Sequence, residues 1–350
     1  GPGVCWAKQQ EFAVNATIAQ VVTAATGWSS AQFQVQLRPP LTIQSNNLYD
    51  VMGPGPRLIA KEYLNKDELP AAPTREFLSL QLLAPYNIAP QPRFFDLAEG
   101  PIVLYEFMNG EMWPEQSPTP AMLTGLAESW LTMRRLGSDG LWASRGLETL
   151  PQIVVNTGKR LQTYLEWAEG QIGVTTAFAA ESRHLLQRAA TAHEKLTARP
   201  ILHYFCRSDP RFANLIHRPD GRVGMVDWED AGLHDPAYAI AGFFGHANQE
   251  HLLTATDRAV FMAAYRAGLA ADEDPELPAR VALYERLLSV AWLALLLGAG
   301  CNRPDQRDWQ VHHMPVNAKL HRFRARALSD TYAEFEQKLM TLEPIPFFPT

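Results

Sequence analysis

The sequence predicts an α+β protein with two lobes, a small β-rich N-terminal lobe over residues 1–107 and a larger, mainly helical C-terminal lobe over residues 108–350. Two observations lead to this prediction. In the first hundred residues, runs of alternating apolar and polar residues are separated by glycine and proline turns, a pattern typical of antiparallel strands. After Gly110, apolar residues recur at helical spacing over most of the remaining chain. A length of 350 residues leaves room for two lobes of this kind.

The N-terminal lobe is predicted to open with a helix and a strand. The helix spans residues 16–25 and stops at Gly27. Phe33, Val35 and Leu37 then alternate with glutamines, as in a half-buried strand. A strand in this position can form one edge of an antiparallel sheet.

A hairpin, a helix and a second strand pair follow. The run Met-Gly-Pro-Gly-Pro at residues 52–56 lies between two β-prone segments and indicates a hairpin. A helix is predicted over residues 74–83, with Thr74 as its N-cap. The last strand pair of the lobe is predicted over residues 94–96 and 102–107.

The C-terminal lobe is predicted to be helical, with a short β insert in its middle. Each helix is inferred from apolar residues that recur on one helical face. Helices are predicted over residues 120–136, 153–168, 179–198, 236–245, 259–268, 279–297 and 316–339, and short strands over residues 201–205, 215–217 and 223–227.

Composition and charge argue against several classes of protein. The chain has 31 basic and 37 acidic residues, so its net charge of −6 lacks the basic footprint of a nucleic-acid-binding protein. Its 3 cysteines are far apart, which argues against a disulfide framework or zinc site and fits a reducing cytoplasm. The apolar run at residues 287–300 is too short to span a bilayer, and no signal peptide is evident. We expect a cytoplasmic protein without a nucleic-acid or membrane partner, and the oligomeric state stays open.

The chemically informative stretch is the polar loop at residues 207–214, which apolar segments flank on both sides. Asp209 and Asn214 lie five residues apart in this loop, and Asp227 follows on a later β segment. Mg²⁺ prefers such oxygen ligands. Phosphoryl transfer uses one carboxylate to orient an attacking hydroxyl, and an amide with a second carboxylate to hold the metal. Each residue alone also suits an ordinary turn or strand end, but their order and spacing together favour catalysis.

This stretch resembles the aminoglycoside phosphotransferase and choline kinase family, which has a protein-kinase-like fold. The pattern of that family appears here as Asp209, Asn214, the run Asp-Trp-Glu at residues 227–229, and Asp235 within Gly-Leu-His-Asp-Pro. The resemblance implies that Asp209 is the catalytic base, that Asn214 and Asp227 bind Mg²⁺, and that Asp235 is structural. It extends in order over roughly residues 18–241.

The chain departs from the family pattern at three positions. Arg207 and Arg211 stand where histidines are usual, two residues before and two residues after the catalytic Asp. A guanidinium is always charged, so each arginine either stabilises charge that develops on the γ-phosphate or pairs with a neighbouring carboxylate. Ala239 stands where the family commonly has Asp, which removes a buried helix contact.

The resemblance also implies that the N-terminal lobe holds ATP. Lys61 and Glu76 match the Lys–Glu pair that fixes the α- and β-phosphates in kinase-like folds. Two alternatives stay open, namely that Lys61 is a solvated strand residue and that Glu68 takes the place of Glu76.

The expected phosphate-covering turn has no glycine, unlike that of protein kinases. Its backbone amides and the side chains of Ser45, Asn46 and Asn47 can still donate to phosphates, although a simple β-turn is the alternative. The hinge that pairs with the purine is expected after the last strand of the lobe, and nothing there distinguishes ATP from GTP. This hinge consists of Tyr105, Glu106, Phe107 and Met108.

These features together predict a small-molecule kinase that binds MgATP between its two lobes and phosphorylates the hydroxyl of a small molecule. The acceptor is expected to be an amine-bearing or natural-product alcohol such as an aminoglycoside, and a sugar or nucleoside stays open. The alternative is a catalytically inactive kinase-like protein that binds nucleotide or a partner and regulates. The candidate residues for binding this acceptor molecule are Glu229, Asp230, Glu250, Asp257 and Trp309.

Overall fold

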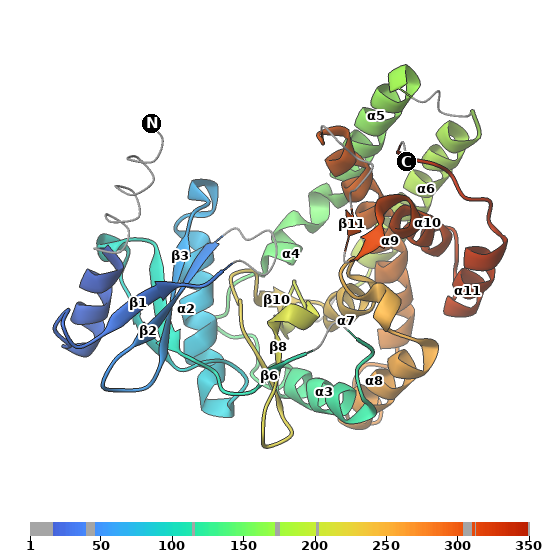
Figure 1. Ribbon diagram of the computed structural model, residues 1–350. Coiled ribbons are helices and arrows are strands. Elements are labelled where there is room, and N and C mark those ends of the chain that lie inside the picture. Colours follow the sequence, from blue (N-terminus) through green and yellow to red (C-terminus); the bar gives the residue numbers. More distant parts are fainter. Residues whose placement is uncertain are drawn as a thin grey trace, which may run out of the picture. The chain divides into compact units, whose positions relative to one another are not determined.

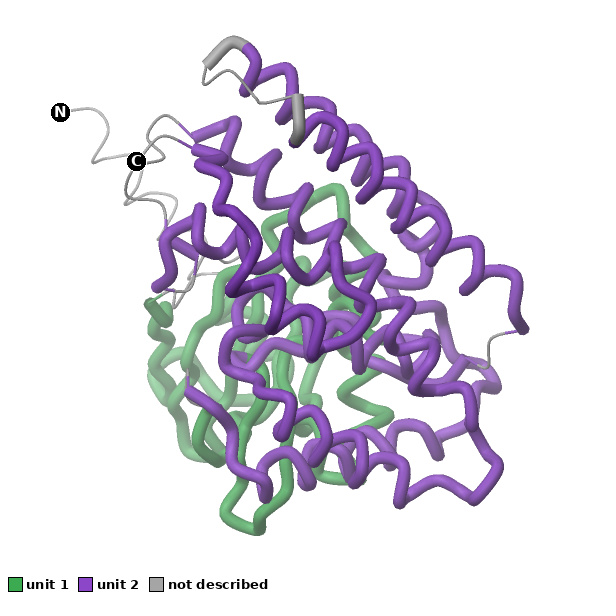
Figure 2. The backbone as a smooth tube through the Cα atoms, turned by 90° about the vertical axis from the view of Figure 1, so that its right-hand side faces the viewer, with its two compact units in different colours: residues 1–112, 214–231 green, residues 113–213, 232–350 purple. Residues whose placement is uncertain are grey.

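The structure is a computed structural model that describes residues 17–39, 46–113, 116–171, 176–200, 203–303, 310–311 and 313–348 (Figure 1). The chain forms two compact units, coloured separately in Figure 2. Unit 1 comprises residues 1–112 and 214–231, and unit 2 comprises residues 113–213 and 232–350. The units therefore interleave along the sequence. As a result, Asp209 belongs to unit 2, whereas Asn214 and Asp227 belong to unit 1.

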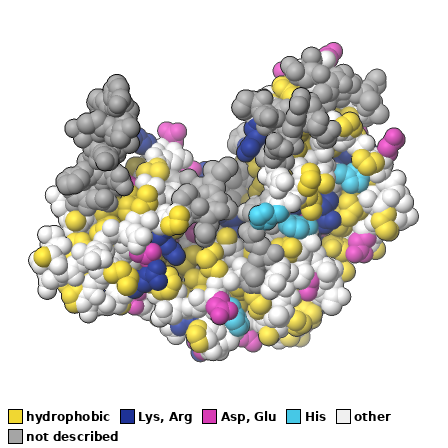
Figure 3. All heavy atoms as spheres, viewed as in Figure 1, with side chains coloured by type: hydrophobic (Ala, Val, Ile, Leu, Met, Phe, Trp, Pro, Cys, Tyr) yellow, Lys and Arg dark blue, Asp and Glu magenta, His cyan; other side chains and the backbone are white. Residues whose placement is uncertain are grey.

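Unit 1 is built on a five-stranded antiparallel sheet with the strand order β1-β2-β3-β5-β4. Val51 lies opposite Leu58, which confirms the predicted hairpin. Figure 3 shows acidic and basic side chains beside one another over this sheet, where Asp50 pairs with Arg38 and Arg57. The strands are β1 (Gln34–Leu37), β2 (Asn46–Met52), β3 (Leu58–Tyr63), β4 (Pro92–Phe95) and β5 (Ile102–Glu106).

The turn between β2 and β3 packs closely against Trp28. A Cβ atom on Gly53 would come within 2.4 Å of the Trp28 ring, and one on Gly55 within 2.7 Å. Glycine fits both turn positions, because a side chain there would overlap the ring unless Trp28 shifted. The glycines that mark the hairpin in the sequence are explained by this contact.

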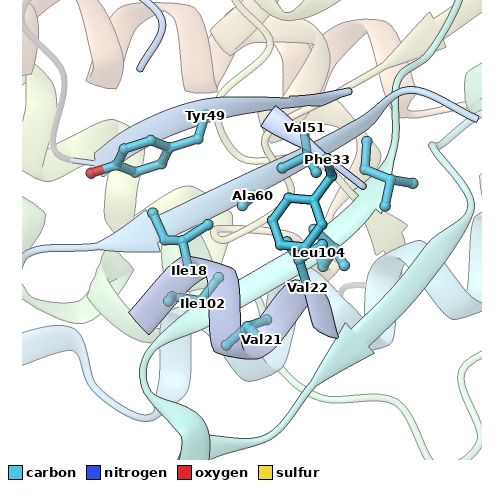
Figure 4. Close-up of a cluster of buried hydrophobic side chains, with 10 residues drawn as sticks. Ile18, Val21, Val22, Phe33, Tyr49, Val51, Ala60, Ile102 and Leu104 are labelled. Atoms are coloured by element: carbon cyan, nitrogen blue, oxygen red, sulfur yellow. The ribbon is translucent and has the colours of Figure 1, made fainter. Parts of the chain in front are cut away.

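Two helices pack on the sheet of unit 1. The helix Thr17–Thr26 confirms the first predicted helix, and Figure 4 shows its Ile18, Val21 and Val22 against strand residues such as Val51 and Leu104. Helix α2 (Ala71–Leu83) packs on β4 and β5. Short 3₁₀ helices complete the described part of this region at Lys66–Glu68, Ala84–Tyr86 and Leu97–Glu99.

The predicted start of α2 was wrong by three residues. Thr74 is not the N-cap but lies inside the helix, where its hydroxyl donates to the carbonyl of Pro70 at 2.7 Å. Pro73 lies in the first turn of the helix. Proline is tolerated there because an N–H group in the first turn has no partner within the helix.

A second, three-stranded sheet of unit 1 brings the two predicted metal ligands together. It consists of β6 (Glu111–Met112), β8 (Leu215–His217) and β9 (Val223–Met225), in the order β6-β8-β9. Leu215 lies opposite Met225, and the N–H of Val226 donates to the carbonyl of Asn214 at 3.0 Å. Asn214, just before β8, and Asp227, two residues after β9, therefore lie beside each other.

Unit 2 is mainly helical, as predicted, and α9 packs against α5, α6, α7 and α10. β7 (Tyr204–Cys206) pairs with β10 (Gly232–His234), and β11 (Gln310–Val311) pairs with β12 (Met314–Pro315). The helices are α3 (Pro120–Arg134), α4 (Arg145–Thr149), α5 (Ile153–Gln171), α6 (Thr176–Thr197), α7 (Pro236–Gly245), α8 (Ala255–Ala267), α9 (Leu277–Cys301), α10 (Val316–Ala327) and α11 (Tyr332–Thr341), with 3₁₀ turns at Leu150–Gln152, Phe212–Asn214 and Glu250–Leu252.

The helix predicted over residues 316–339 was wrong, because two helices, α10 and α11, occupy this stretch. Thr331 begins the second helix, since its side chain accepts a hydrogen bond from the N–H of Glu334. Threonine is a favoured N-cap, and this one interrupts the apolar pattern that suggested a single helix.

α9 is long and apolar enough to cross a membrane by length and composition, and just over half of its most apolar window is buried within the fold. The apolar run at residues 287–300 is therefore part of a helix of 25 residues. The argument that α9 is a core helix and not a membrane span therefore rests on the burial of α9, and not on the length of the apolar run.

Candidate active site

Lys61 lies at the centre of a buried cluster of charges in unit 1. Strand β3 carries it, and only 3% of its surface is exposed. Its Nζ atom lies 3.0 Å from Glu76 Oε2 on α2, 2.5 Å from Asp227 Oδ1 and 3.0 Å from Glu229 Oε2. One ammonium group therefore faces three carboxylates.

The segment after β9 supplies two of these carboxylates through an unusual backbone conformation. Asp227 has a φ of 69°, which few residues other than glycine adopt, although Asp tolerates it better than most. The following residue, Trp228, is fully buried, and its N–H donates to Glu76 Oε2 at 2.7 Å. The contacts made by Trp228 therefore hold the turn that presents Asp227 and Glu229 to Lys61.

The charges of the cluster do not balance. Burial lowers the pKa of Lys61, but Asp227 and Glu76 outweigh this effect and hold it well above its ordinary value. Burial raises the pKa of Glu76, and Asp227 and Glu229 raise it further against the opposing effect of Lys61. If all three carboxylates are ionised, they carry two more charges than Lys61 neutralises. Such a site favours the binding of an additional cation.

The donor set of the cluster fits a hard divalent cation. One oxygen each of Glu76, Asp227 and Glu229 lie within 4.8 Å of one another. The amide of Asn214 lies beside them, with its Nδ2 atom 3.2 Å from Asp227 Oδ2. Carboxylate and amide oxygens are the ligands that Mg²⁺ prefers. Glu229, which the sequence suggested as a residue that binds the phosphate acceptor, lies within this cluster.

The predicted nucleotide-binding residues of β2 differ in their surroundings. The Asn46 amide donates to Glu229 Oε2 at 2.7 Å and so belongs to the cluster around Lys61. The Asn47 amide instead donates to Glu62 Oε2 at 2.9 Å. Ser45 lies outside the described residues.

The predicted hinge overlaps the end of β5, and two of its N–H groups are already hydrogen-bonded within unit 1. The N–H groups of Glu106 and Phe107 donate at 2.8 Å to the carbonyls of Gln91 and Arg57. These two donors are therefore occupied by the fold and are not offered to a purine. Tyr105 is buried, and a side chain on Gly224 would overlap the sulfur atom of Met108.

Asp209 of unit 2 lies beside two arginines and a histidine. Its Oδ2 atom lies 2.8 Å from Arg211 Nε, and its Oδ1 atom lies 3.2 Å from His246 Nε2. Its backbone carbonyl accepts a hydrogen bond from Arg207 Nε at 2.8 Å. Burial alone would raise the pKa of Asp209, but His246, Arg211 and Arg207 outweigh it and lower that pKa. Asp209 is therefore ionised at neutral pH.

The two arginines differ in how they match the two roles that the sequence left open. Arg211 pairs with a neighbouring carboxylate, which is Asp209 itself. Arg207 is 1% exposed and bonds to the backbone of the same loop. Arg207 and Ala239 line the same small cavity, so the alanine leaves space beside the larger arginine side chain.

Two residues that sequence reasoning missed, His246 and Gln249, contact the loop around Asp209. Gln249 is buried, its Nε2 atom donates to the carbonyl of Pro210 at 2.9 Å, and its Oε1 atom accepts from the N–H of Phe212 at 2.8 Å. The one local signal is a polar stretch directly after the apolar helix α7. That signal does not indicate what the stretch contacts.

Two of the residues expected to bind the phosphate acceptor, Glu250 and Asp257, instead make contacts within the fold. Glu250 is buried and pairs with Lys319 at 3.1 Å and Arg322 at 2.9 Å. Asp257 closes the capping box of α8. Asp230 is half-buried. Trp309 lies outside the described residues.

Comparison with known proteins identifies the family. The model of the "Phosphotransferase enzyme family" matches residues 37–284, which is well over half of the chain. A choline kinase from Streptococcus pneumoniae aligns with a TM-score of 0.58 at 16% identity, covering 94% of this chain and 99% of that one. Among curated proteins, no sequence matches this chain.

Two further solved structures share the fold. A spectinomycin phosphotransferase in complex with ADP and spectinomycin has a TM-score of 0.57 at 12% identity, covering 94% of each chain. A macrolide 2′-phosphotransferase from Brachybacterium faecium has a TM-score of 0.54 at 14% identity, covering 83% of this chain and 99% of that one. The kinase-like fold and the family resemblance are thereby confirmed. The chain belongs to the phosphotransferase enzyme family.

Proposed function

We propose that this protein transfers the γ-phosphoryl group of ATP to the hydroxyl of a small molecule. One observation carries the proposal, namely the buried Lys61 that contacts Glu76, Asp227 and Glu229 while Asn214 contacts Asp227. In phosphoryl transfer, an ammonium group binds the nucleotide phosphates and a cluster of carboxylate and amide oxygens binds their metal ion.

The residues of unit 1 are assigned to the nucleotide. Lys61, oriented by Glu76, binds phosphate oxygens, and Asn46 and Asn47 with Ser45 flank the phosphates. Asn214 and Asp227 hold Mg²⁺, and Glu229 offers a further oxygen beside them. Mg²⁺, when bound, neutralises charge on the β- and γ-phosphates. Residues 105–108 are assigned to the purine of ATP or GTP through groups other than the occupied N–H donors of Glu106 and Phe107.

Asp209 of unit 2 is assigned to the acceptor hydroxyl. Its lowered pKa makes it a weak base that is ionised at neutral pH, so it orients the hydroxyl and accepts the proton late in the reaction. Arg211 can keep its pairing with Asp209 or move to the γ-phosphate, and Arg207 shapes the loop through its backbone contact.

The proposed acceptor is an amine-bearing or natural-product alcohol, such as an aminoglycoside. Support comes from the acceptors named for the structural neighbours, which are choline, spectinomycin and macrolides. Asp230 and Trp309 are proposed to contact it, whereas Glu229, which the sequence also suggested for this contact, is assigned to the cluster around Lys61. We expect the enzyme to act in the cytoplasm, without a nucleic-acid or membrane partner.

A phosphate-acceptor screen tests this proposal. The purified protein is incubated with MgATP and with aminoglycosides, choline-type amines, macrolides, sugars and nucleosides, and ADP release and product mass are measured. We expect one class to yield a phosphorylated product, and Asp209→Asn protein to yield far less of it. ATP binding by thermal shift without turnover on any acceptor would favour an inactive, regulatory kinase-like protein instead.

A further inference from the structure

His246 directly follows α7 and faces the side chain of Asp209. Its Nε2 atom lies 3.2 Å from Asp209 Oδ1, while Arg211 Nε approaches the other oxygen of the same carboxylate at 2.8 Å. The two groups come from different parts of the fold, since Arg211 belongs to the loop of Asp209 and His246 to the end of a helix. Together they restrict the rotation of the carboxylate.

The protonation of the His246 ring follows from its second nitrogen. The backbone N–H of Asn248 donates to His246 Nδ1 at 3.2 Å. A ring nitrogen that accepts a hydrogen bond carries no proton, so the proton of the neutral ring lies on Nε2 and points at Asp209. The ring of Trp292 packs edge-on against the imidazole, with centroids 4.8 Å apart, and limits its rotation.

The same segment also holds the backbone of the Asp209 loop. Gln249 bonds to the carbonyl of Pro210 and to the N–H of Phe212, on the C-terminal side of Asp209. The next residue, Glu250, pairs with Lys319 and Arg322 of α10 and so fixes the segment to the helical core. Residues 246–250 therefore control both the path of the loop and the orientation of its carboxylate.

We propose that His246 is a positioning residue that holds the Asp209 carboxylate through its Nε2–H group and does not itself accept the substrate proton. The inference rests on the proposed function, in which Asp209 orients the acceptor hydroxyl. His246 is unsuited as the base because Nε2 already carries a proton and Nδ1 is engaged by Asn248. Among the described residues of unit 2, the charged or titratable groups with the largest effect on Asp209 are His246, Arg211 and Arg207.

Kinetics of two His246 variants test the proposal. In His246→Ala, kcat falls about 10²-fold because the carboxylate loses its orientation, whereas the KM for ATP stays unchanged. The acidic limb of the kcat/KM profile moves to higher pH, because a donor that lowers the pKa of Asp209 is lost. His246→Gln, which can place an amide N–H near the same oxygen, restores most of kcat and the original limb.

The control is His321→Ala, which removes a half-buried histidine that contacts the carbonyl of Leu339 on another part of unit 2. It leaves kcat and the pH profile unchanged. Equal losses in His246→Ala and His246→Gln with an unmoved acidic limb would overturn the proposal. Circular dichroism of each variant confirms that it is folded.

A measurement that needs no turnover separates this inference from the proposed function. In protein labelled with ¹⁵N-histidine, the His246 signals are assigned by their loss in His246→Gln, and we expect a proton on Nε2 and none on Nδ1. An Nδ1–H tautomer would overturn the inference even in an active enzyme. The expected tautomer in a wild-type protein that phosphorylates no acceptor would instead contradict the proposed function.

Discussion

Asp209 and Asp227 are both carboxylates of the family pattern, yet their surroundings are electrostatically opposite. Asp209 lies near Arg207, Arg211 and His246, so positive charge and hydrogen-bond donors surround it. Asp227 shares the single ammonium of Lys61 with two other carboxylates. The first environment keeps one carboxylate ionised without a metal, whereas the second has excess negative charge that a metal can neutralise. The contrast accounts for the different roles proposed for two chemically identical groups.

The largest effect is expected from Asp227→Ala. The substitution removes an oxygen ligand that the proposed metal site needs, so phosphoryl transfer should fall below detection and Mg²⁺ should no longer enhance ATP binding. Isothermal titration with ATP, with and without Mg²⁺, measures this directly. Mg²⁺-dependent ATP binding that survives in folded Asp227→Ala protein would remove Asp227 from the metal site.

Asp209→Asn should affect catalysis alone. Turnover should fall about 10²–10⁴-fold, because the amide cannot accept the hydroxyl proton. The Kd for MgATP should match that of the wild-type protein, in contrast to Asp227→Ala. Comparable losses of MgATP affinity in the two variants would contradict the division of roles between the carboxylates.

Lys61→Met tests the excess of negative charge in unit 1. Removing the ammonium from this buried cluster should destabilise the protein by about 3–5 kcal/mol at neutral pH. The pKa of Glu76 is already raised in the folded state by burial, and loss of Lys61, which opposes this effect, raises it further above its unfolded value. Stability is then lost as pH rises, so the deficit should shrink as pH falls toward about 4.

Chemical denaturation at several pH values measures this dependence. Mg²⁺ without nucleotide should stabilise Lys61→Met protein more than wild-type protein, because the carboxylates no longer have their ammonium partner. A deficit that is independent of pH and unaffected by Mg²⁺ would indicate that the cluster is not the source of the instability.

The smallest effect is expected from Asn46→Ala. Asn46 donates to Glu229 in the cluster, whereas Asn47 donates to Glu62. Loss of one such hydrogen bond costs about 0.5–1.5 kcal/mol, so MgATP affinity should fall roughly 2–10-fold. Asn47→Ala serves as the matched variant and should change the affinity less. A larger loss in Asn47→Ala would reverse the assignment of these two residues.

Local signals in the sequence were sufficient for elements that depend on local chemistry. Helix α7 matches its predicted bounds because Asp235 caps it and Pro236 occupies its first turn. The β2–β3 hairpin follows from its turn residues. The predicted helix bounds were wrong at two places. Helix α2 begins before Pro73, which lies in its first turn, and Thr331, between α10 and α11, caps the second of these helices.

The contacts of the candidate site were only partly predictable. The family pattern singled out Lys61, Glu76 and Asp227, and the structure brings their side chains together in unit 1. The family pattern gave no indication of His246 and Gln249, because these residues lie more than 30 positions after Asp209 and belong to no local motif. Their contacts depend on how α7 packs in three dimensions.

One oxygen of Glu76 accepts hydrogen bonds from both Lys61 Nζ and the Trp228 backbone. Helix α2, strand β3 and the segment after β9 therefore converge on a single atom. An outward swing of α2 would break both bonds at once and leave an ammonium and an amide without this partner. Partial opening is thus costly, and we expect these three segments to exchange their amide hydrogens as one cooperative block. Such a block opens as a unit, and the three segments do not detach from one another one at a time.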